Sequence, residues 1–241
     1  MTSGDFPFLA VHRLAAGTRF FHVHPWHVDG VTREIRYPAD AFNPAAPYRF
    51  AGLLADPRRA MWYGGSTLDC ALWETVLRDL GVIGPGGRVI VPPGWAAGKR
   101  LSIVRTTCDL SVVELMPDAL RRMGAGASVR DAWMALTQTA DHASTHAPAA
   151  ALLAAADVKG LDINGLTWFS RQTGGRREHP LALALYRPPC PLTDLFEPDP
   201  AIAAIDLDST LGQRVIDSVL RKAGFHRVED PGDEGSTEDA E

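Results

Sequence analysis

The sequence has few cysteines, no long apolar run and no excess of basic residues. Its three cysteines are Cys70, Cys108 and Cys190, an odd number whose spacing fits neither a disulfide framework nor a zinc ribbon. This usage favours a reducing compartment, so we expect a soluble protein of the cytoplasm. No run of about 18 apolar residues occurs, and the first residues lack the basic and apolar regions of a secretory signal. We therefore expect neither a membrane span nor secretion.

The charge balance disfavours a nucleic-acid-binding surface. The chain has 24 basic and 29 acidic residues, and seven of the acids lie in residues 229–241, which include no base. This polar segment is expected to be a disordered acidic tail. Without those seven acids the body has 22 acidic against 24 basic residues. A near-neutral body predicts no direct contact with nucleic acid, whereas an anionic small molecule would need only a few local arginines.

The length and apolar content predict one domain over residues 1–228, followed by the tail at 229–241. A chain of 241 residues that is 46% hydrophobic can bury one sizeable core. Apolar segments typical of strands occur at 60–65, 88–92, 101–105, 111–115, 165–170 and 181–186. Helical patterns occur at 67–80, from 128, at 147–157 and at 209–223. Strands interrupted irregularly by helices indicate an α+β fold.

Two of the predicted helices have a defined apolar face. The helix at 67–80 is expected to begin at a capping pattern formed by Ser66 and Asp69. The apolar residues at helical spacing are Leu68, Leu72, Val76 and Leu80 in this helix, and Leu211, Val215, Val219 and Leu220 in the helix at 209–223. These residues are expected to face the core.

A histidine cluster in "FHVHPWH" raises the question of a metal site. His22, His24 and His27 lie within six residues, and imidazole is a common zinc or iron ligand. No nearby cysteine or carboxylate pattern completes a coordination set. We interpret the three histidines as a surface or strand-edge cluster and expect no metal.

Four short motifs carry the polar residues of greatest interest. They are "YRF" with Arg49, "MWYGGS" with Tyr63, "ALWE" with Glu74, and "GLTWFSR" with Ser170 and Arg171. Taken singly, an arginine and a glutamate on solvated surfaces and a packed tyrosine would explain the first three. Ser170 and Arg171 stand where an apolar strand ends before a glycine-rich loop, a place where side chains commonly face a cleft.

In this order the four motifs resemble the RES domain family, named for an arginine, a glutamate and a serine. The resemblance covers about residues 11–187. It implies a single RES-type domain with a central mixed or split sheet flanked by helices, similar in fold to ADP-ribosyltransferase toxins. Family members that have been characterised degrade NAD+, often as toxins of toxin–antitoxin pairs.

The resemblance implies an enzyme that cleaves the nicotinamide–ribose bond of NAD+, with phosphate as acceptor in an NAD+ phosphorylase or water in a glycohydrolase. NAD+ would be the substrate, inorganic phosphate a co-substrate, and no cofactor or metal would be needed. A cognate antitoxin would be the protein partner, and a homo-oligomer is compatible with the sequence. Two alternatives stay open: an ADP-ribosyltransferase that modifies a protein, and an inactive RES-like binding module.

The resemblance assigns catalytic roles to Arg49, Glu74 and Ser170, and substrate binding to Tyr63, Arg49 and Arg171. A glutamate near the anomeric carbon suits a reaction that passes through an oxocarbenium-like transition state. The planar fork of Arg49 suits a diphosphate or an incoming phosphate. The Tyr63 ring can lie against nicotinamide, and the Ser170 hydroxyl can orient the ribose or the amide.

Overall fold

The computed structural model describes residues 9–25, 62–78, 80, 82–83, 87–91, 94–122, 126–127, 131, 145–170, 180–186 and 192–228. The strands are β1 (Val11–Leu14), β2 (Arg19–Pro25), β3 (Trp62–Gly65), β4 (Val82–Ile83), β5 (Arg88–Ile90), β6 (Lys99–Thr106), β7 (Leu110–Glu114), β8 (Gly165–Phe169), β9 (Leu181–Leu185), β10 (Phe196–Pro198), β11 (Ile205–Asp206) and β12 (His226–Val228). The helices are α1 (Leu68–Trp73), α2 (Pro117–Arg122), α4 (His146–Val158), α5 (Leu192–Leu195) and α6 (Thr210–Lys222).

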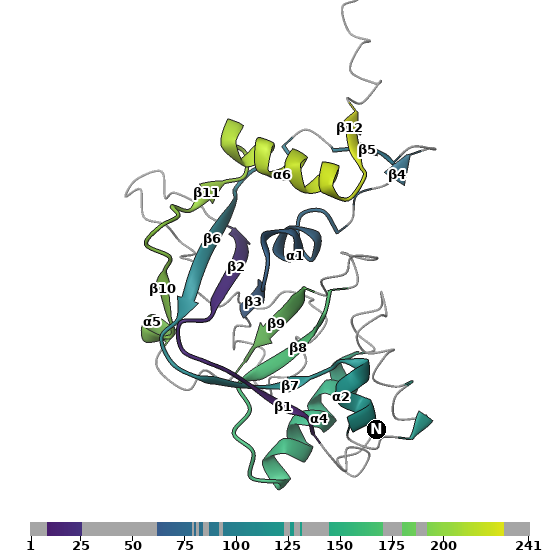
Figure 1. The fold of residues 1–241 in the computed structure, drawn as a ribbon, viewed down its shortest axis with the longest axis vertical. Helices are drawn as coiled ribbons and strands as arrows, with labels where there is room; N and C mark the ends of the chain where they lie inside the picture. Colours follow the sequence, from purple (N-terminus) through teal and green to yellow (C-terminus); the bar gives the residue numbers. More distant parts are fainter. Residues whose placement is uncertain are drawn as a thin grey trace, which may run out of the picture.

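In the described part of the chain, nine strands form one curled mixed sheet (Figure 1). Its order is β1-β7-β8-β9-β3-β2-β6-β10, and β11 also pairs with β6. Strands β7 and β8 run parallel, whereas the other neighbours in this sheet are antiparallel. A smaller sheet has the order β12-β5-β4. The fold is therefore the expected single α+β domain with a mixed sheet.

Helices α1, α4 and α6 cover one face of the large sheet, because they share its two main apolar clusters. In the first cluster, α4 packs Leu152 and Ala156 against Val113, Leu166 and Trp168 of β7 and β8. The second cluster joins α1, the turn after α1, α6 and the strands β2 and β6. Its buried side chains include Leu72, Val76, Leu77, Val23, Leu101, Ile216, Val219 and Leu220. Figure 1 shows α6 across one end of the sheet, with α1 between α6 and the strands.

The opposite face of the sheet holds a third cluster that is rich in aromatic side chains. Trp62 of β3 is fully buried and stacks on Phe196, with ring centroids 4.4 Å apart. Phe20 of β2 meets the same indole edge-on at 6.0 Å. Leu183 and Leu195 pack into this cluster. Because side chains alternate along a strand, Trp62 and Tyr63 serve opposite faces.

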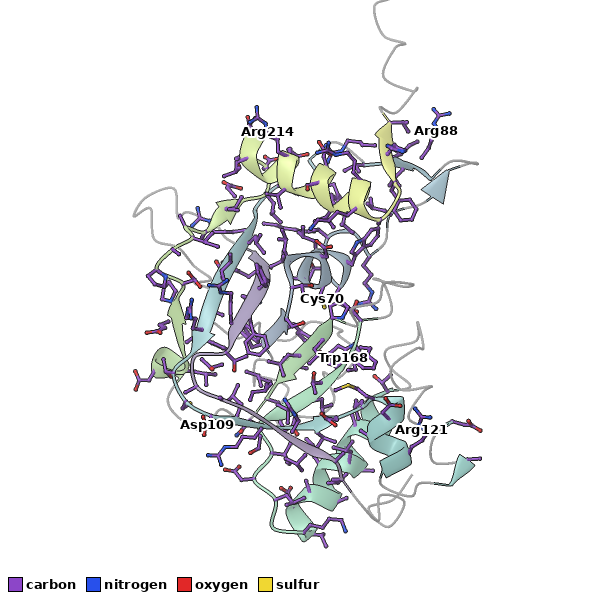
Figure 2. The ribbon with its side chains drawn as sticks, viewed as in Figure 1. Cys70, Arg88, Asp109, Arg121, Trp168 and Arg214 are labelled. Carbon is purple, nitrogen blue, oxygen red and sulfur yellow. The ribbon has the colours of Figure 1, made fainter. Side chains whose placement is uncertain are left out.

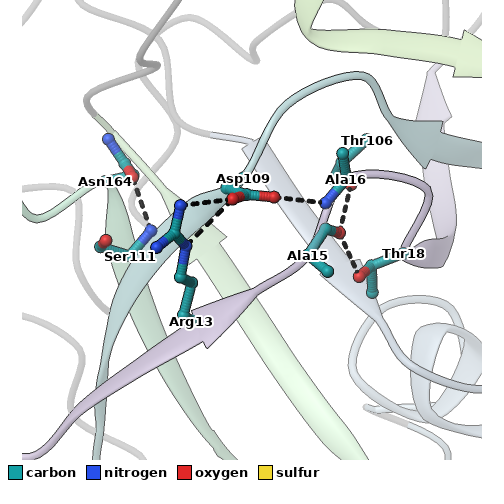
Figure 3. Close-up of polar contacts among 8 residues, drawn as sticks. All are labelled: Arg13, Ala15, Ala16, Thr18, Thr106, Asp109, Ser111 and Asn164. Carbon is teal, nitrogen blue, oxygen red and sulfur yellow. Dashed lines mark hydrogen bonds and ion pairs between the residues drawn. The ribbon is translucent and has the colours of Figure 1, made fainter.

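A polar network fixes the corner where the sheet turns from β2 and β6 to β1 and β7 (Figure 3). The Asp109 carboxylate accepts hydrogen bonds from Ala16 N at 2.8 Å and from Arg13 Nε at 3.0 Å. The Ala16 amide, followed by the Arg13 guanidinium, holds the pKa of Asp109 below its usual range. The hydroxyls of Thr18 and Thr106 both donate to the carbonyl of Ala15. The two long strand pairs are thus tied at their common bend.

The helix predicted at 67–80 is present but shorter, and its cap differs. Helix α1 spans only Leu68–Trp73, and Thr67 is its N-cap, accepting from Cys70 N at 3.1 Å. The predicted cap, Ser66, instead accepts a hydrogen bond from Leu181 N of β9. The Ser66 hydroxyl is held by a neighbouring strand, so the capping role falls to the next residue.

The helix predicted at 209–223 is confirmed as α6, with Ser209 as its N-cap, but its buried face differs from the prediction. Leu211 is 57% exposed, whereas Gly212 and Ile216 are buried. A Cβ atom on Gly212 would lie 2.4 Å from Leu207 Cα. The missing side chain lets α6 approach the β11 segment closely, and this approach sets the rotation of the helix.

The histidine cluster is not at the surface or at a strand edge. His22 and His24 are buried, 0% and 2% exposed, on β2, which pairs with β6 along its full length and touches β3 on its other side. That prediction is therefore wrong for these two residues. The histidines alternate with apolar residues along β2, and this polar content led us to expect an edge or surface position, whereas β2 is a central strand. His27 lies outside the described residues, as do most of the helix predicted from Ser128 and the tail at 229–241.

The helix predicted at 147–157 is confirmed as α4. Among the described helices, none combines the length and apolar character needed to cross a membrane.

Candidate functional site

A pocket lies on the helix-covered face of the sheet, where β2 and β3 separate. We call this separation the β2–β3 split: within the described residues, the two strands pair at Phe21 and Gly65 alone. The pocket encloses about 620 Å³ when the solvent-filled space at its open mouth is counted. Its lining is Phe21 and Val23 of β2, Tyr63 and Gly64 of β3, Ala71, Glu74, Thr75 and Arg78 of α1 and the turn after it, and Trp168, Ala182 and Leu183 of β8 and β9.

Gly65 brings α1 directly onto the strands that form the pocket floor. A Cβ atom at this position would lie 2.7 Å from the backbone nitrogen of Ala71, so a larger residue would push α1 away. Two hydrogen bonds join this segment to the backbone of Leu181. Leu181 N donates to Ser66 Oγ at 2.8 Å, and Cys70 Sγ donates to Leu181 O at 3.4 Å. The first turn of α1 is therefore fixed against β3 and β9.

The early end of α1 places three polar side chains at the pocket. The Leu72 carbonyl accepts from the amides of both Thr75 and Leu77, at 3.3 and 2.8 Å, so the regular helical pattern stops there. The Thr75 hydroxyl also donates to the carbonyl four residues earlier, at 2.6 Å. The chain then turns rather than continuing as a helix. As a result Glu74, Thr75 and Arg78 all line the pocket.

Two aromatic side chains supply apolar surface to the same pocket. Tyr63 on β3 is half-buried, and Trp168 on β8 is 4% exposed. Both pack against the cluster that contains Cys70 and α4. Figure 2 shows Cys70 on α1 above Trp168 on β8. A planar, apolar ligand part would find ring surfaces here beside a carboxylate and a guanidinium.

Ser170 lies beside the pocket, next to the first turn of α1. It is 7% exposed, and its amide donates to Pro180 O at 3.0 Å. Burial raises the pKa of the Cys70 thiol, the Glu74 carboxylate adds to this, and a hydrogen bond with Ser170 opposes it. Ser170 and Glu74 therefore approach the same thiol. With its pKa raised, Cys70 is a protonated packing residue at neutral pH and is not a nucleophile.

The structure brings some of the sequence-predicted site residues together. Tyr63 and Glu74, 11 positions apart in the chain, line one pocket. Ser170 reaches the same region from β8 through its contact with the Cys70 thiol. Arg49 and Arg171 lie outside the described residues.

Arg78, Thr75 and Trp168 line the pocket but were not singled out from the sequence. Two signals point to them. In the helix that the sequence predicts at 67–80, Arg78 follows Glu74 by four positions and would share its face, although in the structure both residues follow the end of α1. Trp168 precedes Ser170 by two positions, so both side chains point to the same face of the strand.

Within the described residues, no group of three His, Cys, Asp or Glu side chains is arranged to hold a metal ion. His22 and His24 stack on each other, with ring centroids 5.1 Å apart, on the sheet face opposite the pocket.

A comparison with protein families gives a match that covers most of the chain. The family model described as the RES domain matches residues 24–223 of the 241-residue chain. The matched region begins within β2 and ends just beyond α6, so it includes every described residue of the pocket except Phe21 and Val23 of β2. No curated protein matches the chain.

Proposed function

The chain belongs to the RES domain family, a toxin-like family related to NAD+, and on that basis we propose that it cleaves the nicotinamide–ribose bond of NAD+. The acceptor of the ADP-ribose would be phosphate or water. One observation carries the proposal: the pocket at the β2–β3 split joins the Glu74 carboxylate to the ring surfaces of Tyr63 and Trp168.

The chemistry of the bond explains why this combination is suitable. When the glycosidic bond breaks, its electron pair goes to the ring nitrogen of nicotinamide, which leaves as a neutral molecule. Positive charge then develops on the ribose ring, and a carboxylate next to the anomeric carbon stabilises it. An oxygen of phosphate, or of a water that loses a proton, forms the new bond to that carbon. In this proposal Glu74 is the stabilising carboxylate.

The aromatic residues would bind the leaving group. Nicotinamide is flat, and Tyr63 and Trp168 offer ring surface within the pocket. The Tyr63 hydroxyl can also hydrogen-bond a polar group of the substrate. Ser170, next to the first turn of α1, would orient the ribose or the amide.

A cation in the pocket would hold the negative part of the substrate. Arg78 lines the pocket four positions after Glu74, and its planar guanidinium suits a diphosphate. Arg49 and Arg171, which the family motifs identify, would bind the diphosphate or the incoming phosphate from the segments that carry them. Repulsion between the substrate phosphates and Glu74 would thereby be offset.

We further propose that loss of cellular NAD+ makes the protein a cytoplasmic toxin that a cognate antitoxin restrains. The family relation supports this role. An antitoxin that covers the pocket mouth would block entry of NAD+.

The test is to incubate the purified full chain with NAD+, with and without inorganic phosphate, and to follow the products by phosphorus and proton NMR. We expect free nicotinamide to appear as NAD+ disappears. ADP-ribose 1''-phosphate would identify a phosphorylase, and ADP-ribose a glycohydrolase.

Other products would point to the alternatives. ADP-ribose found on an added protein extract would identify a protein-modifying transferase. Intact NAD+ in both incubations, with a correctly folded chain, would exclude the enzymatic proposal for the isolated protein and favour a binding module.

A further inference from the structure

His22 is a buried ionisable residue that the proposed reaction does not use. It lies on β2, and its side chain is fully buried on the sheet face opposite the pocket. Its ring is stacked between two others, His24 at 5.1 Å and Trp62 at 4.8 Å between centroids. Such close packing on both sides leaves the imidazole little freedom to rotate.

The ring lies beside the place where the sheet loses its regular pairing. Strand β3 pairs with β9 at all four of its residues, and β2 pairs with β6 at all seven. Between β2 and β3, however, the described pairing is limited to Phe21 and Gly65. Along β3, the backbone of Tyr63 lies on the same strand edge as that of Gly65, the edge that faces β2, at a position where the described β2–β3 pairing has stopped. A carbonyl at this position can accept a hydrogen bond from a side chain of β2.

His22 provides that donor through its side chain. Its Nδ1 lies 2.5 Å from the carbonyl oxygen of Tyr63. Because a carbonyl can only accept, the proton must be on Nδ1. Burial, with a further contribution from His24, lowers the pKa of His22 to about 3, so the ring is neutral at physiological pH. The neutral ring therefore carries its proton on Nδ1 and donates it to the Tyr63 carbonyl.

We propose that His22 is a positioning residue for the pocket, because its Nδ1–H holds the Tyr63 carbonyl across the β2–β3 split. The side chain of Tyr63 projects from the same residue towards the pocket. A fixed backbone carbonyl therefore also fixes the position from which the phenol ring extends. The effect on catalysis rests on the proposed function, whereas the hydrogen bond itself does not.

The proposal is tested by two substitutions of His22, of which one keeps a hydrogen-bond donor in the side chain and the other does not. His22→Asn places a side-chain N–H near the position of Nδ1, and His22→Leu fills similar space without a donor. We expect His22→Leu to raise the KM for NAD+ by about tenfold or more, since it removes the hydrogen bond that holds the Tyr63 carbonyl. His22→Asn should bring KM back to within about threefold of wild type.

Leu110→Ala is the control for a loss of stability alone. Leu110 of β7 is fully buried in the apolar cluster on the same sheet face as His22. This variant should lose stability without a change in KM. A purely structural role for His22 would instead make His22→Leu resemble the control. Equal KM values for His22→Leu and wild type, or equal losses in His22→Asn and His22→Leu, would overturn the proposal.

A second measurement decides the proposal even if the chain does not cleave NAD+ or if His22→Leu does not fold. Nitrogen-15 NMR of the wild-type chain at neutral pH should show His22 protonated at Nδ1, with a proton that exchanges slowly with water. A proton on Nε2, or fast exchange at Nδ1, would contradict it. Absence of nicotinamide release together with a slowly exchanging Nδ1 proton would reject the proposed function alone.

Discussion

At the scale of single residues, the pocket combines opposite charges a short distance apart in the chain. Glu74 and Arg78 are separated by four positions and line the same cavity. The proposed roles divide between them: the carboxylate acts on the reacting sugar, and the guanidinium binds an anionic part of the substrate. Substitution of each residue should therefore affect different kinetic constants.

Arg78→Gln should mainly weaken NAD+ binding. Loss of the charged fork is expected to raise the KM for NAD+ by about tenfold or more, with a smaller change in kcat. Arg78→Lys keeps the charge but loses the two-point geometry, so its KM should lie between those of Arg78→Gln and wild type. Initial-rate kinetics of nicotinamide release would measure this.

Arg214→Gln serves as the control for Arg78. Arg214 is exposed on α6, and Figure 2 shows it on the outer side of this helix, away from Cys70 and Trp168. Its substitution should leave KM unchanged. An unchanged KM in Arg78→Gln would remove this arginine from the binding site.

At the scale of the elements, the contact of α6 with the segment after β11 sets the packing of the second apolar cluster. Gly212→Ala should destabilise the fold by about 1–3 kcal/mol, because the new methyl group would overlap the backbone of Leu207 and Asp206. Urea unfolding would measure the loss.

Leu211→Ala, one position away, is the matched control. Leu211 is exposed, so its truncation should change the free energy of unfolding by less than about 0.5 kcal/mol. Equal effects of the two substitutions would show that α6 packs in another rotation.

The sequence predicted the strands whose apolar runs are continuous and missed those whose pattern is mixed. Segments such as 101–105 and 181–185 lie in β6 and β9 as expected. Strand β2 was interpreted as a polar histidine cluster, because the sequence does not reveal that Trp62 of β3 stacks on the imidazole of His22. The ends of helices were least predictable, since partners such as Leu181 N come from distant strands.

The site was predictable only where family motifs identify it. Tyr63 and Glu74 were found through such motifs, and they line one pocket. Arg78 and Trp168 have no comparable motif of their own, and their role depends on where α1 ends and how β8 packs. Those features follow from tertiary hydrogen bonds, which a single sequence does not show.

At the scale of the whole molecule, stability should depend on pH through His22. Its pKa in the folded protein is lowered from 6.5 to about 3, so the unfolded chain binds the proton more tightly. The free energy of unfolding should therefore decrease as the pH falls from about 6.5 towards 3. The loss should be on the order of 5 kcal/mol at most. Chemical denaturation at a series of pH values would measure it.

Two carboxylates affect the free energy of unfolding at the acidic end of the same pH range. The pKa of Asp199 is lowered, chiefly by the Ala201 amide and then by Arg105 and Arg19, and that of Asp109 is lowered as well. Their stabilising effect is present above a pH of about 4 and is lost below it. In His22→Asn the decline should begin only in this lower range. A decline between pH 6.5 and 5 that persists in His22→Asn would assign it to another group.

The proposed chemistry depends on the negative charge of Glu74, and Glu74→Gln isolates that charge. The substitution keeps the size of the side chain but removes the carboxylate, and neither a cavity nor a buried charge results. The decisive measurement is the rate of nicotinamide release from NAD+ by wild type and Glu74→Gln, at saturating NAD+ and with equal melting temperatures. We predict that kcat falls by about 100-fold or more while NAD+ still binds. A kcat close to that of wild type would contradict the proposed role of Glu74 and the mechanism built on it.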